Sequence, residues 1–330
     1  MAKGLTVRGH PLVWTVPKAL PAWLQKYPYE KQLAFLEHHV RSLIAATGGR
    51  VQLWDMVNEM LWEPSLRHVP ERDWPHVETA DELLTTIEPA LHWAREEAPD
   101  ARLVLNDYGL EVDFCQGVTA AEQRRRYVEL ITEMQRRGCA PDAVGTQAHV
   151  GKWFPMAAVQ QTFDQLASTG LPLEISEFWA KPGAHPCPEG RDAAQREADL
   201  IRYCEQFYTL AFGHPAVEHL TYWGGEEFFQ RDGYEPSPLY EALDELINQR
   251  WRTRARITAD EAGRVRMRGF HGRYALRWAD RHGNPTGAKS IWRQDTAASR
   301  PWWCDQAWVS HQAPAPIALS DARHASSHLA

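Results

Sequence analysis

The stretch LWDMVNEM, residues 53–60, decides the fold. Four of its first five side chains are apolar, which is typical of a buried strand. The apolar run then ends in two adjacent polar residues, Asn58 and Glu59. A buried strand that ends in an amide and a carboxylate fits a (β/α) barrel, because such barrels carry their functional side chains at the carboxyl ends of the strands.

The rest of the chain repeats this pattern of short apolar segments separated by longer helical ones. The expected strands are 5–14, 51–57, 101–107, 142–149, 171–178 and 217–223. The expected helices are about 29–46, 79–97, 120–137, 156–169, 192–211 and 238–249. Gly138 follows the third helix, where a C-terminal cap belongs. This alternation predicts an α/β fold with a parallel sheet.

A barrel fits this alternation better than a dinucleotide-binding fold. No strand is followed by GxGxxG or by GxxxxGK[ST], the glycine-rich loops that hold phosphates. All six expected strands end in polar or aromatic residues, which a barrel would gather at one rim. We therefore predict a (β/α)8 TIM barrel.

Composition limits the possible partners. The 330 residues include 44% hydrophobic and 24% charged residues, a globular balance. The net charge of −7 argues against nucleic acid as a partner, and no apolar run approaches a membrane span. The five cysteines form no CxxC pair, so we predict neither a metal site nor a cofactor. The 15 Trp and 10 Tyr suit stacking on a neutral polymer.

The alternation of strand and helix patterns ends after residue 250. The alternating segment RVRMRGFHGRYALRW, residues 264–278, predicts a β-hairpin with its turn at His271–Gly272. Beyond residue 295 the sequence is rich in Ala, Ser, His and Pro, which predicts a disordered tail. The expected organisation is a barrel at 1–250, a β-hairpin extension at 251–295 and a tail at 296–330.

Two of the acidic residues, Glu59 and Glu177, end different expected strands. Hydrolysis of a glycosidic bond needs two carboxyl groups that flank the bond, so this pair is a candidate for that chemistry. Asp55 and Asp107 are expected to hold loops through backbone hydrogen bonds. No HExxH set that would bind a catalytic zinc is present, which disfavours a metal-dependent hydrolase.

Six motifs, in order and spacing, resemble one known family. They are GHPLVW (9–14), WDMVNE (54–59), LNDYG (105–109), VGTQAH (144–149), EISEF (174–178) and YWG (222–224). Together they resemble glycoside hydrolase family 10, which contains endo-β-1,4-xylanases on a (β/α)8 barrel. The resemblance covers roughly residues 4 to 250 and extends into the hairpin region.

The resemblance implies roles for individual residues. Glu59 matches the general acid/base and Glu177 the nucleophile. Asn58 matches the residue that binds the 2-hydroxyl of the sugar at the cleavage site. The rest of that sugar's pocket is matched by His10, Trp14, Gln147, His149 and Trp223. Tyr108 matches a residue on the leaving-group side.

The chain also departs from the family pattern. Trp179 stands two residues after the nucleophile, where the family usually has an aspartate, and Thr15 replaces a usual histidine. The first motif matches the family's third strand, so we expect a barrel truncated at its N-terminus to about six βα units. The missing part would carry any leader, and the full-length form is expected to be secreted.

The leading hypothesis is a retaining endo-β-1,4-glycanase that hydrolyses xylan, or a related β-1,4-linked polysaccharide, by double displacement. The alternative is an inactive fragment or a carbohydrate-binding pseudoenzyme of the same fold. Release of reducing sugar from xylan separates the two.

Overall fold

The computed structural model describes residues 6–63, 66, 77–114, 117–150, 154–180, 190–229, 234–270, 272–280, 282–293 and 317–318. The chain forms two compact units. The first comprises Met1–Phe212 and Ala216–Glu226, and the second comprises Gly213–Pro215 and Glu227–Ala330. Cys115, Cys187 and Cys304 lie outside the described residues, whereas Cys139 and Cys204 are buried free thiols.

The first unit is a curled half-barrel of parallel strands. In sheet order the strands are β1 (Arg8–Gly9), β2 (Leu53–Asn58), β3 (Arg102–Asp107), β4 (Ala143–Thr146), β6 (Leu173–Ala180) and β7 (Val217–Tyr222). The short β5 (His149–Val150) also pairs with β6. All of these pairings are parallel, which confirms the predicted fold class.

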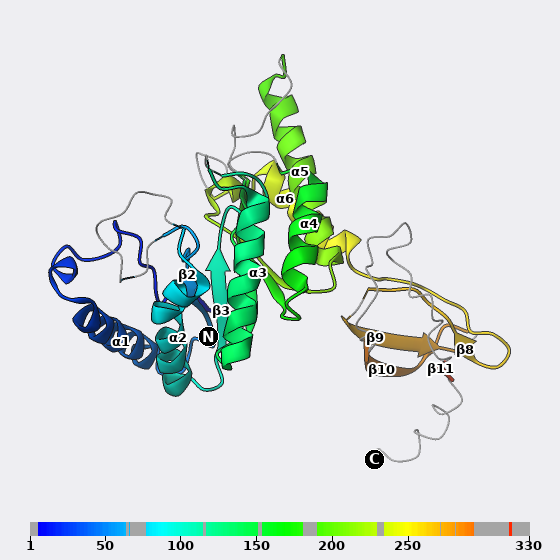
Figure 1. The fold of residues 1–330 in the computed structure, drawn as a ribbon. Coiled ribbons are helices and arrows are strands. Elements are labelled where there is room, and N and C mark those ends of the chain that lie inside the picture. Colours follow the sequence, from blue (N-terminus) through cyan, green and yellow to red (C-terminus); the bar gives the residue numbers. More distant parts are fainter. Residues whose placement is uncertain are drawn as a thin grey trace. The chain divides into compact units, whose positions relative to one another are not determined.

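Helices connect the strands and form the outer layer of the sheet. They are α1 (Tyr29–Ala46), α2 (Ala80–Glu97), α3 (Ala120–Arg137), α4 (Met156–Ala167) and α5 (Ala193–Gly213). The first four pack against one another in chain order, as Figure 1 shows. Each lies within a few residues of its predicted range. No helix in the described ranges is long and apolar enough to cross a membrane.

Local sequence explains where these helices begin and end. Thr79 caps α2, and its hydroxyl and backbone exchange hydrogen bonds with Glu82 in a capping box. Thr119 caps α3 in the same position. Gly138 ends α3 with φ of 74°, a left-handed conformation that glycine adopts without steric cost, as its place in the sequence predicts.

The first strand is shorter than predicted. Only Arg8 and Gly9 pair regularly with β2, although the expected segment was 5–14. Pro11 has no N–H and cannot continue a regular ladder. The chain nevertheless stays beside β2, because Leu12 and Val13 donate to the carbonyls of Asp55 and Met56 at 2.9 and 3.0 Å. His10 and Trp14 are therefore still held at the strand end.

The central strands are buried on both faces, as parallel sheets covered by helices usually are. All six residues of β2 are buried, whereas the positions of β7 are either half-buried or exposed.

The interior also holds a charged cluster around Glu174, whose carboxylate is 0% exposed. Arg8 bonds to both Glu174 and Asp55, and the Arg102 Nε donates to Glu174 at 2.7 Å. Burial acts to raise the pKa of Glu174, but His219 and Arg8 outweigh it and lower that pKa to about 2.

The second unit contains α6 (Pro238–Glu245) and the strands β8 (Arg264–Val265), β9 (Gly272–Ala279), β10 (Pro285–Arg293) and β11 (Ile317–Ala318). β9 and β10 form the predicted antiparallel hairpin, and β8 pairs with β11. The hairpin turn predicted at His271–Gly272 is wrong, because the turn lies at 280–284, within the segment ADRHGNPTG (279–287) that the sequence also predicts to be a turn. Asp280 stabilises this turn by accepting from the backbone N–H groups of His282 and Asn284. The remainder of the predicted tail lies outside the described residues.

We predict that Glu174→Ala destabilises the first unit by about 3–5 kcal/mol, because it leaves the Arg8 guanidinium buried without one of its carboxylates. The control is Glu218→Ala, which removes the half-exposed partner of Arg102 and should cost about 1 kcal/mol or less. Urea unfolding followed by tryptophan fluorescence measures both. Equal losses in the two variants would contradict the assigned role of Glu174.

Candidate active site

The predicted site residues lie at the carboxyl ends of the strands of the first unit. Eight of the nine are joined by hydrogen bonds or ring contacts: His10, Trp14, Asn58, Glu59, Gln147, His149, Glu177 and Trp223. The ninth, Tyr108, follows β3 at the same rim and stacks on Trp62. Six separate segments of sequence thus contribute side chains to one place.

Glu59 leaves its strand in an unusual backbone conformation. Its φ is 66°, in the left-handed region that a residue with a Cβ rarely adopts. The Glu59 N–H donates to the Asn106 carbonyl at 2.9 Å, which ties the turn to the neighbouring strand. Backbone strain of this kind persists where the surrounding structure enforces it and is common at functional sites.

Both oxygens of the Glu59 carboxyl accept hydrogen bonds. The Trp14 Nε1 donates to Oε2 at 2.7 Å, and the Gln147 Nε2 donates to Oε1 at 2.8 Å. The carboxyl is therefore held in one orientation by side chains from two other strand ends. A group that passes a proton to a bound substrate needs such a fixed position.

Glu177 is 4% exposed and is held by neutral or cationic donors. The Asn106 Nδ2 donates to Oε1 at 2.9 Å, and the His149 Nε2 lies 2.9 Å from Oε2. The His10 Nε2 lies 3.8 Å from Oε1. These contacts hold the Glu177 carboxyl in one orientation.

An amide network links the two carboxyls. Asn106 donates from Nδ2 to both Glu177 and the Asn58 Oδ1, and Gln147 donates to both Glu59 and the Asn58 Oδ1. Because these bonds use the oxygen of Asn58, its Nδ2 is the group left to meet a sugar hydroxyl. Asn58 thus contacts both of the amides that bind the two carboxyls.

Sequence reasoning missed Asn106 as a site residue, although the motif LNDYG contains it. The residue is 1% exposed, and its Oδ1 accepts from the Ser176 hydroxyl at 2.5 Å. Gly145 on the adjacent strand leaves room for it, since a Cβ there would lie 2.5 Å from the Asn106 Oδ1. The signal that could have found it is a buried amide at a strand end, which must find hydrogen-bond partners inside the site.

The two aspartates that were expected to hold loops behave differently from each other. Asp107 meets the expectation, because its carboxylate accepts from the backbone N–H groups of Leu61 and Tyr108, each at 2.8 Å. Burial raises the pKa of Asp107 well above its ordinary value. The prediction for Asp55 is wrong, since Asp55 binds the side chains of Arg8 and His10 instead.

His10 is therefore anchored between two carboxylates. Its Nδ1 lies 2.9 Å from the Asp55 Oδ2, and its other nitrogen faces Glu177. Burial acts to lower the pKa of His10, and the nearby positive charge of Arg8 acts in the same direction. The hydrogen bond to Asp55, with the charges of Glu177 and Asp55, outweighs both and raises that pKa. The imidazolium form places a positive charge beside Glu177.

Tryptophan rings pack against the two histidines that lie near Glu177. Trp223 is 39% exposed and lies with its ring centroid 5.4 Å from that of His10 and 5.7 Å from that of His149. Trp179 meets His149 edge to face at 5.9 Å. Such rings are flat apolar walls against which a pyranose can lie.

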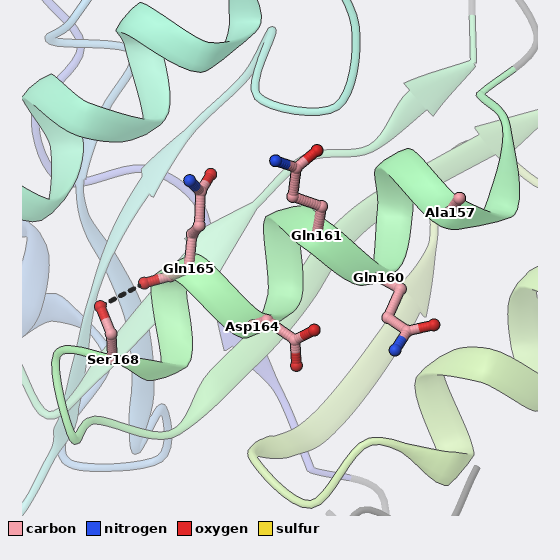
Figure 2. Close-up of a pocket in the computed structure, with 6 residues that line it drawn as sticks. All are labelled: Ala157, Gln160, Gln161, Asp164, Gln165 and Ser168. Carbon is pink, nitrogen blue, oxygen red and sulfur yellow. Dashed lines mark hydrogen bonds between the residues drawn. The ribbon is translucent and has the colours of Figure 1, made fainter. Parts of the chain in front are cut away.

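One hollow of the surface lies apart from these residues. A depression of about 450 Å³ lies on the outer side of α4, lined by Ala157, Gln160, Gln161, Asp164, Gln165 and Ser168 (Figure 2). It contains one carboxylate, Asp164, and the Ser168 hydroxyl is used locally, donating to the Gln165 carbonyl at 2.6 Å. Chemistry that needs two carboxyls cannot occur there.

Two carboxyls held at the carboxyl ends of the strands of a parallel half-barrel are the arrangement that a glycoside hydrolase needs. The family model "Glycosyl hydrolase family 10" matches residues 1–229, and the chain belongs to that family.

The chain is similar to several endo-1,4-β-xylanases. It is 26% identical to endo-1,4-beta-xylanase B of Thermotoga neapolitana over 76% of this chain and 72% of that protein. Native xylanase 10B from Thermotoga maritima has a similar fold, with a TM-score of 0.60, 24% identity and 76% of each chain covered. Xylanase 10B from Thermotoga petrophila in complex with xylobiose gives a TM-score of 0.58, with 23% identity and 76% of each chain covered. The chain spans less than two thirds of the length of several other relatives, so the activity of the whole protein is a matter of proposal.

We predict that His10 loses its proton at a pH above the ordinary histidine value of 6.5, because Asp55 and Glu177 stabilise its charged form. Asp55→Asn should lower this pKa. The control Glu129→Gln, which changes an exposed partner of Arg125 on α3, should leave it unchanged. NMR of ¹⁵N-labelled histidine side chains measures the titration directly. A midpoint at or below 6.5 in the unaltered protein would show that Asp55 does not hold the charge.

Proposed function

We propose that this protein is a retaining endo-β-1,4-glycanase that hydrolyses xylan by double displacement. The observation that carries the proposal is the pair of carboxyls held at one rim, Glu177 by Asn106 and His149, and Glu59 by Trp14 and Gln147. Family membership and the xylanases among the relatives support xylan as the substrate.

In the first step, the Glu177 carboxylate attacks the anomeric carbon of the sugar at the cleavage site. The bond from that carbon to the leaving sugar's oxygen breaks, and Glu59 gives its proton to that oxygen. Trp14 and Gln147 keep the Glu59 carboxyl in place during the transfer. The contacts with Asn106, His149 and His10 keep the Glu177 carboxyl in position for the attack.

In the second step, Glu59 acts as a base. It takes a proton from a water molecule, whose oxygen attacks the anomeric carbon and releases Glu177 as a carboxylate. Two inversions give net retention of configuration. The Asn58 amide is placed to bind the sugar's 2-hydroxyl, a contact that strengthens as the transition state forms in enzymes of this kind.

Glu177→Ala should abolish xylan hydrolysis, since the attacking atom is lost, while near-UV circular dichroism stays unchanged. Azide or formate should restore part of the activity by replacing the missing carboxylate. A matched control is Glu218→Gln, which alters a half-exposed carboxylate on β7 without removing an attacking group and should retain turnover. Near-normal turnover by Glu177→Ala would refute the assignment of the nucleophile.

The product should keep the β configuration of the cleaved bond. Double displacement requires carboxyls about 5–5.5 Å apart, whereas single displacement by water needs about 6.5–9.5 Å. Proton NMR of the first reducing ends released from xylohexaose, recorded before mutarotation, distinguishes the anomers. An α anomer as the first product would contradict the proposed mechanism.

A further inference from the structure

The sequence of the second unit carries a large surplus of positive charge. Residues 250–293 contain 11 Arg and one Lys but only three acidic residues, although the whole chain has a net charge of −7. The match to the family model ends at residue 229, before this segment begins. The surplus therefore belongs to a part of the chain that the catalytic groups of the first unit do not explain.

The arginines of this segment lie on its surface. Arg264, Arg266 and Arg268 are exposed, whereas the two apolar residues between them are half-buried. This alternation is that of an extended chain, in which every second side chain points to the same side. The three guanidinium groups therefore form one row.

A hydrogen-bonded junction fixes three stretches of this unit to one another. The Phe270 N–H donates to the Thr253 Oγ1 at 3.0 Å, and the Tyr274 hydroxyl lies 3.1 Å from the same oxygen. The Tyr274 hydroxyl also donates to the Phe270 carbonyl. Gly269 allows this close approach, since a Cβ there would lie 2.2 Å from the Tyr274 hydroxyl oxygen.

The junction brings two groups of arginines together. The exposed Arg252 and Arg254 stand on either side of the half-buried Thr253 in the sequence, and Arg268 directly precedes Gly269. A Cβ at Gly269 would lie 2.9 Å from the Thr253 hydroxyl oxygen, so the two stretches of backbone meet there. Arginines that are more than ten positions apart in the sequence thus belong to one basic surface.

Most of this charge is not neutralised. Six exposed arginines pair with no carboxylate among the residues that the structure describes: Arg252, Arg254, Arg256, Arg266, Arg268 and Arg277. In the first unit, by contrast, Arg41, Arg125 and Arg137 each contact two or three carboxylates. Exposed cations without local partners attract an anionic ligand.

A polysaccharide that carries scattered carboxylates fits this surface best. A guanidinium group binds a carboxylate through two parallel hydrogen bonds, which gives the contact a defined geometry. Nucleic acid, in comparison, carries one charge per about 1.7 Å of helix axis. The net charge of −7 repels so dense a polyanion much more than a sugar polymer whose only charges are occasional side groups.

We propose that the second unit binds uronic acid side groups of a β-1,4-linked polysaccharide through Arg252, Arg254, Arg266 and Arg268. The proposal rests on the function proposed above, because the bound polymer is the one that the active site cuts. Both units belong to one chain, so binding by the second raises the concentration of the polymer around the first. The protein then favours acidic xylan over neutral xylan through a lower KM.

Binding is measured first, without turnover, in the Glu177→Ala variant of the full chain. In affinity electrophoresis at low salt, glucuronoxylan should retard this variant more strongly than neutral arabinoxylan does. Sodium chloride at about 0.5 M should remove the difference, because it screens exposed charges.

Two double variants locate the surface. Arg266→Gln with Arg268→Gln, and separately Arg252→Gln with Arg254→Gln, should each weaken the binding of glucuronoxylan roughly fivefold, which corresponds to about 1 kcal/mol. Either pair can test the surface where the other folds poorly. The matched control replaces Arg125 and Arg136 of α3 by Gln, which changes the net charge equally and should leave binding unchanged.

Turnover supplies a second measurement, in the chain that retains Glu177. Each double variant in the second unit should raise KM for glucuronoxylan roughly fivefold and leave kcat unchanged. For xylohexaose, which has no carboxylate, both kcat and KM should remain those of the unaltered protein.

The outcomes separate this proposal from the function on which it rests. If the unaltered protein cleaves neither xylan nor xylohexaose, the proposed function fails. If it cleaves them but glucuronoxylan and arabinoxylan retard it equally, or both double variants bind like the unaltered protein, the basic surface is refuted as a uronate site. Equally tight binding of duplex DNA also refutes it, because the surface would then respond to charge alone. A dimer at low salt that both double variants abolish refutes it too, because the partner would be a second copy of this chain.

Discussion

The sheet of the first unit is joined across its interior by one partly buried cation, the guanidinium of Arg8. It bonds to Asp55 on the neighbouring strand and to Glu174 on β6, a strand that lies beyond β3 and β4 in the sheet order. The side chains of Asp55 and Glu174 are at most 1% exposed, so removing either would leave charge uncompensated in the interior. An open curled sheet has no closed ring of backbone hydrogen bonds, and this ion pair joins its first strand to its far side through the interior.

The contacts of Arg8 extend to the carboxyl ends of the strands. Asp55 binds Arg8 through both carboxylate oxygens and also binds His10, whose second nitrogen faces Glu177. Glu177 thus faces a residue whose own charge depends on the interior cluster. Asn106 adds a neutral link, since its amide contacts both Glu177 and Asn58. Side chains from neighbouring strands hold the carboxyls of Glu59 and Glu177 in position.

The sequence predicted the helices, the strands and the side chains at the strand ends well, because the patterns that indicate them are local in the sequence. Apolar residues at helix spacing predicted ranges close to those of α1 to α5. Polar or aromatic residues at the expected strand ends included the eight site residues that the structure brings together. What it could not predict were contacts between distant strands. Asp55 was expected to be a loop residue because nothing in the surrounding sequence indicates a contact with Arg8, 47 positions away. The hairpin turn was misplaced because two His–Gly pairs, 271–272 and 282–283, offer the same turn chemistry, and only the pairing of β9 with β10 selects the second.

The departure from the family at Trp179 now has a physical consequence. His149 meets Trp179 and Trp223 with its ring and Glu177 with its Nε2, and among the described residues it contacts no second carboxylate. His10, by contrast, has Asp55 on its other nitrogen and Arg8 behind that aspartate. His149 is the nearer of the two to Glu177, at 2.9 Å against 3.8 Å for His10. His10 is the one that Asp55 links to Arg8 and, through Arg8, to Glu174. The contacts that reach Glu177 through His10 and the ion pairs that join β1 to β6 therefore belong to one continuous network.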